Sequence, residues 1–368
     1  MKLKRVAVKN FKGVSDVEFS LESTTRFSQP LTALLGDNGS GKTSVLQAIA
    51  LTLSMATRRT SDIASFHWHG FLPERLSTLG PTCIELDVLF EPEEVEVTSE
   101  LFAAWEESLP AHLKEGMKIV PPSTFSEVTL RFEKGHLLSP QGFGAVNQFC
   151  GRYYIRAMKD TRPDLRNRYP SIGDVFWFDQ HRNLGYRATD EVSSEYSGDG
   201  WQAGVEQLRE YLVGWWAYHK TPSSQRRGKD NIEPLEQLFQ KVFPGRRFLG
   251  VDVRGEGLRG KTNDFYFLIE HDGRIYDLAE MSSGEQAVFP MVYEFVRLNI
   301  HRSIVLIDEL ELHLHPSEQQ RLLASLPKIG SDCQFIITTH SEFLSSAISN
   351  EREIRLEKGC LVKEGICL

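Results

Sequence analysis

The chain has 368 residues, of which 40% are apolar and 25% are charged, and its formal net charge is −8. This composition is typical of soluble globular proteins and excludes collagen-like, low-complexity and intrinsically disordered chains. The excess of acidic residues means that any contact with nucleic acid would need a local basic surface. The five cysteines include no C-x-x-C pair, so they predict neither a disulfide framework nor a zinc ribbon.

Targeting and membrane signals are not found in the sequence. The basic N-terminal segment lacks the apolar core of a signal peptide. No stretch approaches the roughly 20 consecutive apolar residues of a membrane-spanning helix. We therefore expect a cytoplasmic protein without a membrane partner.

The N-terminal part has the pattern of strand, glycine turn and helix. Apolar and polar residues alternate over residues 6–21, as they do in half-buried strands. Residues 31–35 form a short apolar run that ends at Gly36, which indicates a buried strand entering a turn. Apolar side chains then recur at helical spacing over residues 45–53, where we expect a helix.

The middle of the chain is less regular. Residues 91–107 are acidic and rich in Pro, Ser and Thr, and we expect a loop that leads into an insertion. Residues 152–168 are basic and contain several tyrosines. Helical spacing predicts amphipathic helices over 205–215 and 235–242, and an Asp-Gly pair at 272–273 predicts a hairpin turn. No sustained heptad pattern is present, so a long coiled coil is not expected.

The glycine-rich turn at 36–43 has the sequence Gly-Asp-Asn-Gly-Ser-Gly-Lys-Thr and fits the P-loop pattern G-x-x-x-x-G-K-[ST]. Glycines let successive backbone N–H groups face phosphates, and the following helix presents its positive dipole end. Lys42 can reach the β- and γ-phosphates, and the hydroxyl of Thr43 can bind Mg²⁺. The pattern therefore predicts a site for ATP and Mg²⁺ with contacts from Gly36, Asn38, Gly39, Ser40, Gly41, Lys42, Thr43 and Ser44.

Residues 303–309 combine an apolar strand with two carboxylates at its end. Asp308, at the end of a buried strand beside a P-loop, can supply a second anchor for Mg²⁺. Glu309 follows directly and can polarise an attacking water as a general base. Many buried strands end in acidic residues, so it is the combination with the P-loop that favours a metal and catalytic role.

Three further features have structural as well as functional explanations. Ser282 and Glu285 have capping-box spacing, which is typical of a helix N-terminus, although such an end can also bind an anion. His340 follows an apolar strand, where a lone histidine is more often a structural hydrogen-bonding residue than a catalytic one. His67 and His69 could bind a metal, but no acidic or cysteine cluster accompanies them, which favours a structural pair.

In chain order, these motifs resemble the head of ATP-binding-cassette (ABC) ATPases. The P-loop is followed by Ser-Ser-Gly-Glu-Gln at 282–286, Asp-Glu at 308–309, Glu-Leu-His-Leu-His-Pro at 311–316 and Thr-Thr-His at 338–340. The N-terminal segment Asn-Phe-Lys-Gly is similar to the opening strand and turn of one branch. That branch contains the structural-maintenance-of-chromosomes (SMC) proteins, the RecF repair protein and the overcoming-lysogeny-defect (OLD) nucleases.

The resemblance implies an α/β fold, namely a P-loop NTPase of the ABC ATPase head type. Such a head has a mixed β-sheet, an antiparallel N-terminal β-lobe and an inserted, mainly helical segment. The chain would then divide into an N-terminal ATPase lobe with the P-loop (1–95), an insertion (96–175), helices and a hairpin that complete the head (176–280), and a C-terminal ATPase lobe (281–368).

The resemblance also implies roles for single residues around the nucleotide. Lys42 would act in catalysis as well as in phosphate binding, Thr43 and Asp308 would hold Mg²⁺, and Glu309 would be the catalytic base. His340 would be the switch histidine that senses the γ-phosphate.

A second group of residues would act between heads, which would pair through bound ATP in a homodimer or a higher homo-oligomer. Ser282, Gly284 and Glu285 would belong to the signature motif, which contacts the γ-phosphate of ATP held by the other subunit. Residues 311–316 would form the turn that communicates between the subunits. The signature departs mildly from the family pattern, with Met281 for Leu and Ser283 for Gly, and no glutamine loop can be placed.

The functional context follows from the same resemblance. Compact ATPases of this branch resemble subunits of anti-phage systems such as PARIS or Septu, in which the ATPase scaffolds a nuclease or toxin. Only 28 residues follow His340, too few for the nuclease domain of OLD proteins, so we expect a separate effector. The trigger would be DNA or a phage protein.

Two alternatives are weighed against this switch. A repair or chromosome-maintenance ATPase would bind DNA directly, through a basic surface that includes Arg162, Arg166 and Arg168. A transporter ATPase is disfavoured, because 240 residues separate Lys42 from Ser282, much more than the helical insert of transporter heads.

Overall fold

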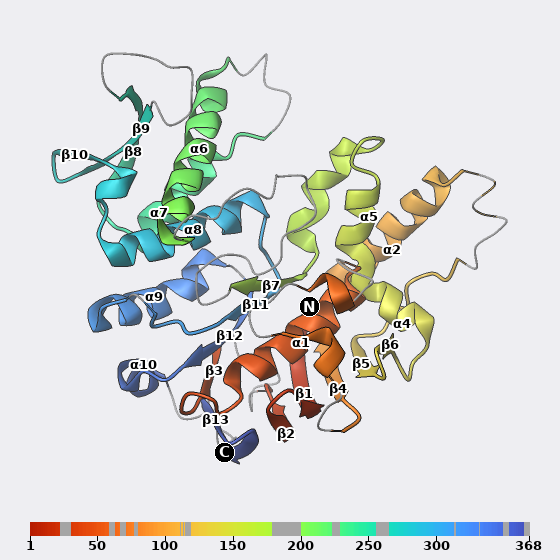
Figure 1. The fold of residues 1–368 in the computed structure, drawn as a ribbon. Helices are drawn as coiled ribbons and strands as arrows, with labels where there is room; N and C mark the ends of the chain where they lie inside the picture. Colours follow the sequence, from red (N-terminus) through yellow and green to blue (C-terminus); the bar gives the residue numbers. More distant parts are fainter. Residues whose placement is uncertain are drawn as a thin grey trace.

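The computed structural model describes residues 1–22, 31–58, 63–66, 71–76, 80–110, 112, 114, 119–178, 200–222, 229–254, 265–312, 314–330, 332–348 and 353–363. Within these residues, eleven strands form one mixed sheet and three more form a second, smaller sheet (Figure 1). Helices pack on both faces of the large sheet. This is the α/β architecture with a mixed sheet that the resemblance to ABC ATPase heads implies.

The large sheet has an antiparallel part and a parallel part. Its strands, in spatial order, are β6 (His136–Leu138), β5 (Glu127–Glu133), β4 (Cys83–Leu89), β1 (Lys2–Phe11), β2 (Val14–Ser20), β14 (Cys360–Lys363), β13 (Glu353–Glu357), β3 (Leu31–Leu35), β12 (Gln334–Thr339), β11 (Ile304–Ile307) and β7 (Val175–Phe178). Strands β6 to β2 pair antiparallel, and β13 to β7 pair parallel. The small sheet has the order β10 (Arg274–Asp277), β9 (Phe265–His271) and β8 (Arg246–Val253).

The helices are distributed around both sheets. They are α1 (Lys42–Ala56), α2 (Pro92–Ser108), α4 (Phe143–Asn147), α5 (Gly151–Ala157), α6 (Gly200–Lys220), α7 (Ile232–Val242), α8 (Ser283–Arg297), α9 (Pro316–Ile329) and α10 (Glu342–Ala347), with short 3-10 helices at Ile63–Ser65, Pro73–Arg75, Gln148–Cys150, Pro163–Ser171 and Leu278–Glu280. Among the described helices, none combines the length and apolar character that crossing a lipid bilayer requires.

Alternate residues of the parallel strands point into two separate cores. Leu306 and Ile336 pack with α1 on one face, whereas Ile307 and Ile337 pack with α7, α8 and α9 on the other. Because side chains alternate across a strand, a strand that is buried on both faces must be apolar throughout. This explains why these strands appear in the sequence as unbroken apolar runs.

The parallel pairing brings distant parts of the chain to one edge of the sheet. Leu35 lies beside Thr339, and Ile337 lies beside Ile307. The carboxyl ends of β3, β12 and β11 therefore meet, and ligands of open parallel sheets bind at this edge. The P-loop, the Asp-Glu pair and the Thr-Thr-His segment all begin there.

The loop expected over 91–107 is instead the helix α2. Pro92 stands in its first turn, where a missing N–H group costs nothing, and two glutamates complement the positive helix end. Val97 and Leu101 are four residues apart and are buried. The helical spacing of the apolar residues therefore predicts this segment correctly, whereas its polar composition wrongly indicated a loop.

Other expectations are confirmed. The amphipathic segments form α6 and α7, and the Asp-Gly pair at 272–273 has φ values of +51° and +77° and joins β9 to β10. His67, His69 and His313 lie outside the described residues.

Candidate functional site

The P-loop connects the end of β3 to the start of α1, as the sequence predicts. Gly36 has φ +150°, and a Cβ atom there would lie 2.3 Å from the carbonyl oxygen of Leu356. Lys42 folds back over the loop, and its Nζ donates to the carbonyl oxygens of Gly36 (2.7 Å) and Asp37 (2.9 Å). Its ammonium group therefore lies within the turn that is expected to hold phosphates.

The charge of Lys42 is balanced by carboxylates from the neighbouring strand end. Burial lowers the pKa of Lys42, while the nearby carboxylates of Glu311, Glu309 and Asp308 act in the opposite direction. A partly desolvated ammonium gains most from a strong anionic partner. The position is therefore suited to a phosphate group.

Asp308 connects the P-loop to the neighbouring strand β12. Thr43 Oγ1 donates to its carboxylate, at 3.0 Å from each oxygen, and Thr338 Oγ1 donates to Oδ1 at 2.6 Å. The side chain is buried, and this burial raises the pKa of Asp308, while the two threonine hydroxyls lower it. The predicted metal pair of Thr43 and Asp308 is thus in direct contact.

Glu309 adopts an unusual backbone conformation, with φ +47°. Its N–H donates to Thr338 Oγ1 at 2.7 Å, and the next residue, Leu310, donates its N–H to the carbonyl oxygen of Thr338 at 3.1 Å. A left-handed conformation at a non-glycine residue costs about 1 kcal/mol or more, and such residues cluster at functional sites. The neighbouring strand therefore holds Glu309 in a fixed position beside Asp308.

His340 is held by Glu311. One carboxylate oxygen of Glu311, Oε1, accepts the His340 N–H (2.6 Å) and lies 2.8 Å from His340 Nδ1. The other oxygen, Oε2, is buried and has no hydrogen-bond partner among the described residues. Ser341 begins α10 and accepts a bond from Leu344 N–H. The histidine ring is 47% exposed and stands at the sheet edge next to the P-loop strand.

The residues at this edge fit Mg²⁺ and a nucleotide phosphate. Magnesium prefers hydroxyl and carboxylate oxygens and completes its shell with water and substrate phosphates. Thr43 and Asp308 offer such oxygens, and the unpartnered oxygen of Glu311 adds a buried polar atom nearby. No group of three or more His, Cys, Asp or Glu side chains in the described part of the chain could hold a metal by itself.

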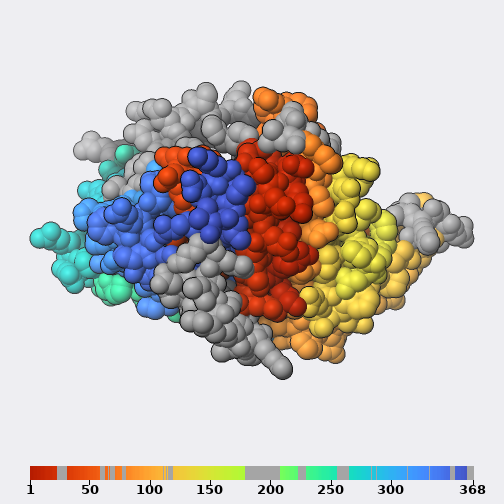
Figure 2. Space-filling model, turned by 90° about the horizontal axis from the view of Figure 1, so that it is seen from below, coloured from red at the N-terminus to blue at the C-terminus, as the bar shows by residue number. Residues whose placement is uncertain are grey.

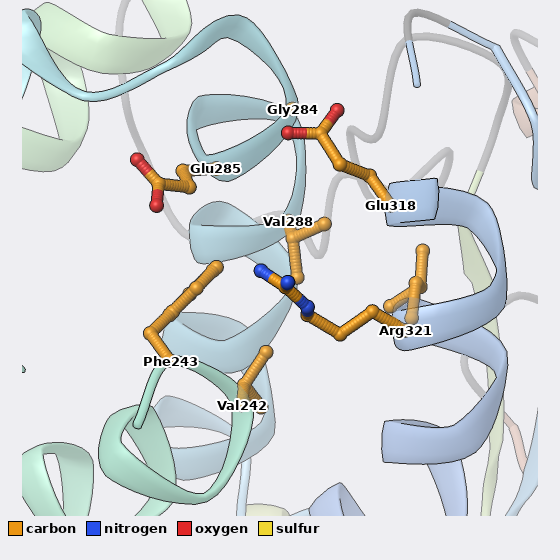
Figure 3. Close-up of a pocket in the computed structure, with 8 residues that line it drawn as sticks. Val242, Phe243, Gly284, Glu285, Val288, Glu318 and Arg321 are labelled. Carbon is orange, nitrogen blue, oxygen red and sulfur yellow. The ribbon is translucent and has the colours of Figure 1, made fainter. Parts of the chain in front are cut away.

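The signature segment begins α8. Ser282 accepts a bond from Glu285 N–H, and the Glu285 carboxylate accepts one from Ser282 N–H, which confirms the capping box. Arg246 of β8 forms an ion pair with Glu285. Glu318 of α9 lies directly against Gly284, because a Cβ atom on that glycine would be only 2.0 Å from Glu318 Oε2 (Figure 3). A carboxylate thus covers the start of α8.

A small pocket borders the signature segment between α7, α8 and α9 (Figure 3). Its floor is apolar and its rim is charged, and Arg321 extends across it. The lining residues are Val242, Phe243, Gly284, Glu285, Val288, Glu318, Arg321 and Leu322. None of them belongs to the P-loop.

The structure therefore divides the predicted site residues into two groups. The P-loop, Thr43, Asp308, Glu309 and His340 meet at the carboxyl edge of the parallel strands. The signature segment makes its contacts with β8 and α9 instead. Sequence reasoning missed the role of Thr338, which bonds both Asp308 and the Glu309 N–H, and its position directly before Thr339 and His340 was the available signal.

Several arginine side chains of the basic stretch at 152–168 have hydrogen-bond or ion-pair partners within the chain. Arg152 is buried and donates to backbone carbonyl oxygens, including those of Leu298 and Asn299. Arg162 pairs with Asp164 at 3.0 Å, and Arg168 pairs with Glu100 at 3.3 Å. These pairs reduce the net positive charge that this surface could offer to nucleic acid.

Two family descriptions match this chain over separate ranges of residues. Residues 151–346, just over half of the chain, match the family described as "AAA domain, putative AbiEii toxin, Type IV TA system". The chain belongs to this family. Residues 1–126, which include the P-loop, match a second family of the same kind, "AAA ATPase domain".

Three curated proteins are similar to parts of this chain. "Retron Ec83 probable ATPase" of Escherichia coli is 31% identical over 25% of this chain and 19% of its own length. "OLD nuclease" of Thermus scotoductus is 27% identical over 92% of this chain and 59% of its own length. "Septu protein PtuA" of Bacillus mycoides is 21% identical over 96% of this chain and 40% of its own length. The chain thus spans at most about three fifths of these relatives.

The fold is that of an SMC head. An SMC head solved with the C-terminal winged-helix domain of ScpA is 14% identical, with a TM-score of 0.50, and the comparison covers 100% of this chain and 96% of that one. At this identity the likeness concerns the fold alone. It agrees with the ABC-type head expected from the motifs.

Proposed function

We propose that this chain binds and hydrolyses Mg-ATP, dimerises through ATP held between two heads, and acts as a switch for a separate effector in antiviral defence. The observation that carries the proposal is the contact among the P-loop Thr43, the strand-end Asp308 and Thr338, with Glu309 fixed beside them. Family membership and the named relatives support the ATPase class and the defence context.

In this proposal each residue of the P-loop edge has a defined task. Bound Mg-ATP supplies the phosphoryl group and a metal charge that neutralises the phosphates. Lys42 exchanges its bonds with the carbonyls of Gly36 and Asp37 for phosphate oxygens. Thr43 and Asp308 hold the metal, and Glu309 accepts a proton from the attacking water. Glu311 keeps His340 oriented at the edge of the site.

The second copy would complete the site. Within the described part of one chain, the signature segment contacts Arg246 of β8 and Glu318 of α9. In the proposed dimer, Ser282 and Gly284 of one copy would meet the terminal phosphate held by the P-loop of the other. A dimer that forms only with ATP can report nucleotide state to an effector.

The test is a Glu309→Gln variant, which keeps the size of the side chain and removes the base. We expect hydrolysis to fall at least about 100-fold, because a general base contributes that much or more. Mass photometry should show dimers of this variant with Mg-ATP and monomers without it. Glu342→Gln, an exposed carboxylate in the first turn of α10, is the matched control and should behave like wild type.

The effector is tested in the same experiment. Glu309→Gln protein is mixed with the products of neighbouring genes, with and without Mg-ATP. Recruitment of a neighbour by the ATP-bound dimer supports the switch. Hydrolysis by Glu309→Gln at the wild-type rate would contradict the base assignment. A monomer with Mg-ATP would exclude the dimer, and ATP-dependent, salt-sensitive DNA binding in its place would favour the repair alternative.

A further inference from the structure

The P-loop rests on the hairpin formed by β13 and β14. The carbonyl oxygen of Leu356 in β13 lies against Gly36, so closely that a Cβ atom there would be 2.3 Å away. At the tip of the hairpin, Gly359 N–H donates to the carbonyl oxygen of Ser40 at 3.0 Å. The hairpin thus contacts the P-loop at two positions, Gly36 and Ser40.

Gly359 also joins the P-loop to the N-terminal strands. Its carbonyl oxygen accepts the N–H of Ser15 at 3.1 Å, and a Cβ atom on Gly359 would lie 2.0 Å from the carbonyl oxygen of Gly13. On the P-loop side, Gly41 approaches both Val14 and Gly359. Figure 2 shows the C-terminal residues in dark blue directly beside the N-terminal residues in red. There is no space at position 359 for a side chain.

The bond from Gly359 fixes the direction of one peptide group in the P-loop. The carbonyl of Ser40 and the N–H of Gly41 belong to the same planar trans peptide and point in opposite directions. Because the carbonyl is bonded to the hairpin behind the loop, the Gly41 N–H is directed away from the hairpin. A phosphate bound in a P-loop is held by such N–H groups.

We propose that Gly359 is a positioning residue for the nucleotide phosphates, acting through Ser40 and Gly41. The proposal rests on the proposed ATP binding and adds a residue that no matched family segment includes, since these segments end at residues 126 and 346. The hairpin gives the P-loop its binding conformation before nucleotide arrives. Nucleotide affinity then depends on a turn that does not touch the nucleotide.

The chain supplies matched controls for the test. Lys358 and Gly359 have φ values of +49° and +76°, and the turn between β5 and β6 repeats the same Lys-Gly pair with +53° and +80°. The Asp-Gly turn between β9 and β10 has +51° and +77°. A Cβ atom on Gly135 would meet nothing closer than 3.7 Å, and one on Gly273 would meet nothing within 4 Å. Alanine at these controls carries the same backbone strain without the clash.

The experiment compares Gly359→Ala with Gly135→Ala and Gly273→Ala. We expect Gly359→Ala to weaken the binding of Mg-ATP and Mg-ADP at least about tenfold in calorimetry. Both controls should stay within about twofold of wild type, since the backbone strain common to all three turns lowers folding stability without moving the P-loop. Hydrogen exchange of residues 36–43 in the nucleotide-free protein should be faster in Gly359→Ala alone.

A measurement on the wild type covers the case in which Gly359→Ala does not fold. Because coupling is reciprocal, Mg-ADP should slow hydrogen exchange at Gly359 and leave Gly135 and Gly273 unchanged. Equal affinities in all three variants, or no change at Gly359, would overturn the positioning role while the proposed function stands. Failure of wild type to bind Mg-ATP would instead overturn the proposed function.

Discussion

The P-loop end and the signature end of this head are built in different ways. At the P-loop, backbone groups and buried side chains hold one another: Lys42 bonds to loop carbonyls, and Thr43 bonds to Asp308. At the signature, the half-exposed side chain of Glu318 covers Gly284. In the proposed dimer, the P-loop half of the nucleotide site would therefore be preformed within the chain, whereas the signature half would need the Glu318 side chain to move before it could meet a phosphate.

The largest effect is expected from Lys42→Ala, which tests the preformed end. The variant loses the ammonium group that lies within the loop, and with it the strongest charged contact to phosphate. We expect Mg-ATP affinity to fall at least about 100-fold, equivalent to about 2.7 kcal/mol. Calorimetric titration measures the change, and Lys9→Ala, an exposed lysine on β1, is the control. Affinity within a few fold of wild type would show that the loop does not hold the phosphates.

Asp308→Asn, also at the P-loop end, is expected to change folding stability and ATP hydrolysis in opposite directions. Burial raises the pKa of Asp308, so the folded chain retains this proton to a higher pH than the unfolded chain does. Stability is therefore lost as the pH rises through that range, and the ionised carboxylate destabilises the nucleotide-free protein at neutral pH. We expect Asn to raise Tm by about 2 °C, for a gain of about 1 kcal/mol. We also expect hydrolysis to fall about 100-fold, because the proposed Mg²⁺ site would lose its carboxylate.

The pH dependence checks the physical cause of the Asp308→Asn effect. The Tm difference between variant and wild type should shrink as the pH falls, because Asp308 then becomes neutral in both the folded and unfolded chains. A difference that stays constant with pH would assign the stability change to packing. Hydrolysis that survives at the wild-type level would remove Asp308 from the metal site.

A smaller effect is expected from Glu311→Gln. The amide can still accept the His340 N–H, but it loses the charge that holds the ring at Nδ1. We expect kcat for hydrolysis to fall about tenfold, equivalent to about 1.4 kcal/mol, with nucleotide affinity unchanged within about twofold. Glu342→Gln serves as the control. A loss of affinity without a change in kcat would place Glu311 in phosphate binding instead.

Much of the preformed end could be predicted from the sequence, because its contacts follow from local patterns. The strand, turn and helix around Gly36 and the apolar run before Asp308 each predict their own structure, and parallel pairing then brings them together. The contact of Thr338 with Asp308 could not be predicted in this way, because it depends on the register of two strands 30 residues apart. The contact of Gly359 with Ser40 joins residues that are still farther apart in the sequence.

The signature end was less predictable for the same reason. Ser282 and Glu285 have a recognisable capping pattern, which the structure confirms. That Glu318 covers Gly284 depends on how α8 and α9 pack, and no sequence spacing specifies this. At residues 91–107 the sequence-based prediction was wrong. The acidic, polar composition indicated a loop, whereas the apolar residues at helical spacing are buried in the helix α2.

The smallest effect, from Glu318→Gln, tests the covered end directly. The Glu318 carboxylate lies at the N-terminus of α8, where its charge is favourable in the monomer and would repel the phosphate of a second copy. Gln keeps a side-chain oxygen for the bond to His315 N–H and removes the charge. In a Glu309→Gln background with Mg-ATP, we therefore expect the dissociation constant of the dimer to fall about fivefold, or about 1 kcal/mol.

Glu233→Gln removes an exposed carboxylate from the first turn of α7 and is the matched control for the change in charge. Mass photometry over a concentration series gives the dissociation constant of the dimer for each of the two variants. If Glu318→Gln leaves the dissociation constant of the dimer unchanged, the Glu318 carboxylate does not oppose dimerisation, and the signature end needs no opening step. If it weakens the dimer, Glu318 belongs to the interface that the dimer uses. Only a tighter dimer in Glu318→Gln, absent in Glu233→Gln, identifies a covered signature that must open.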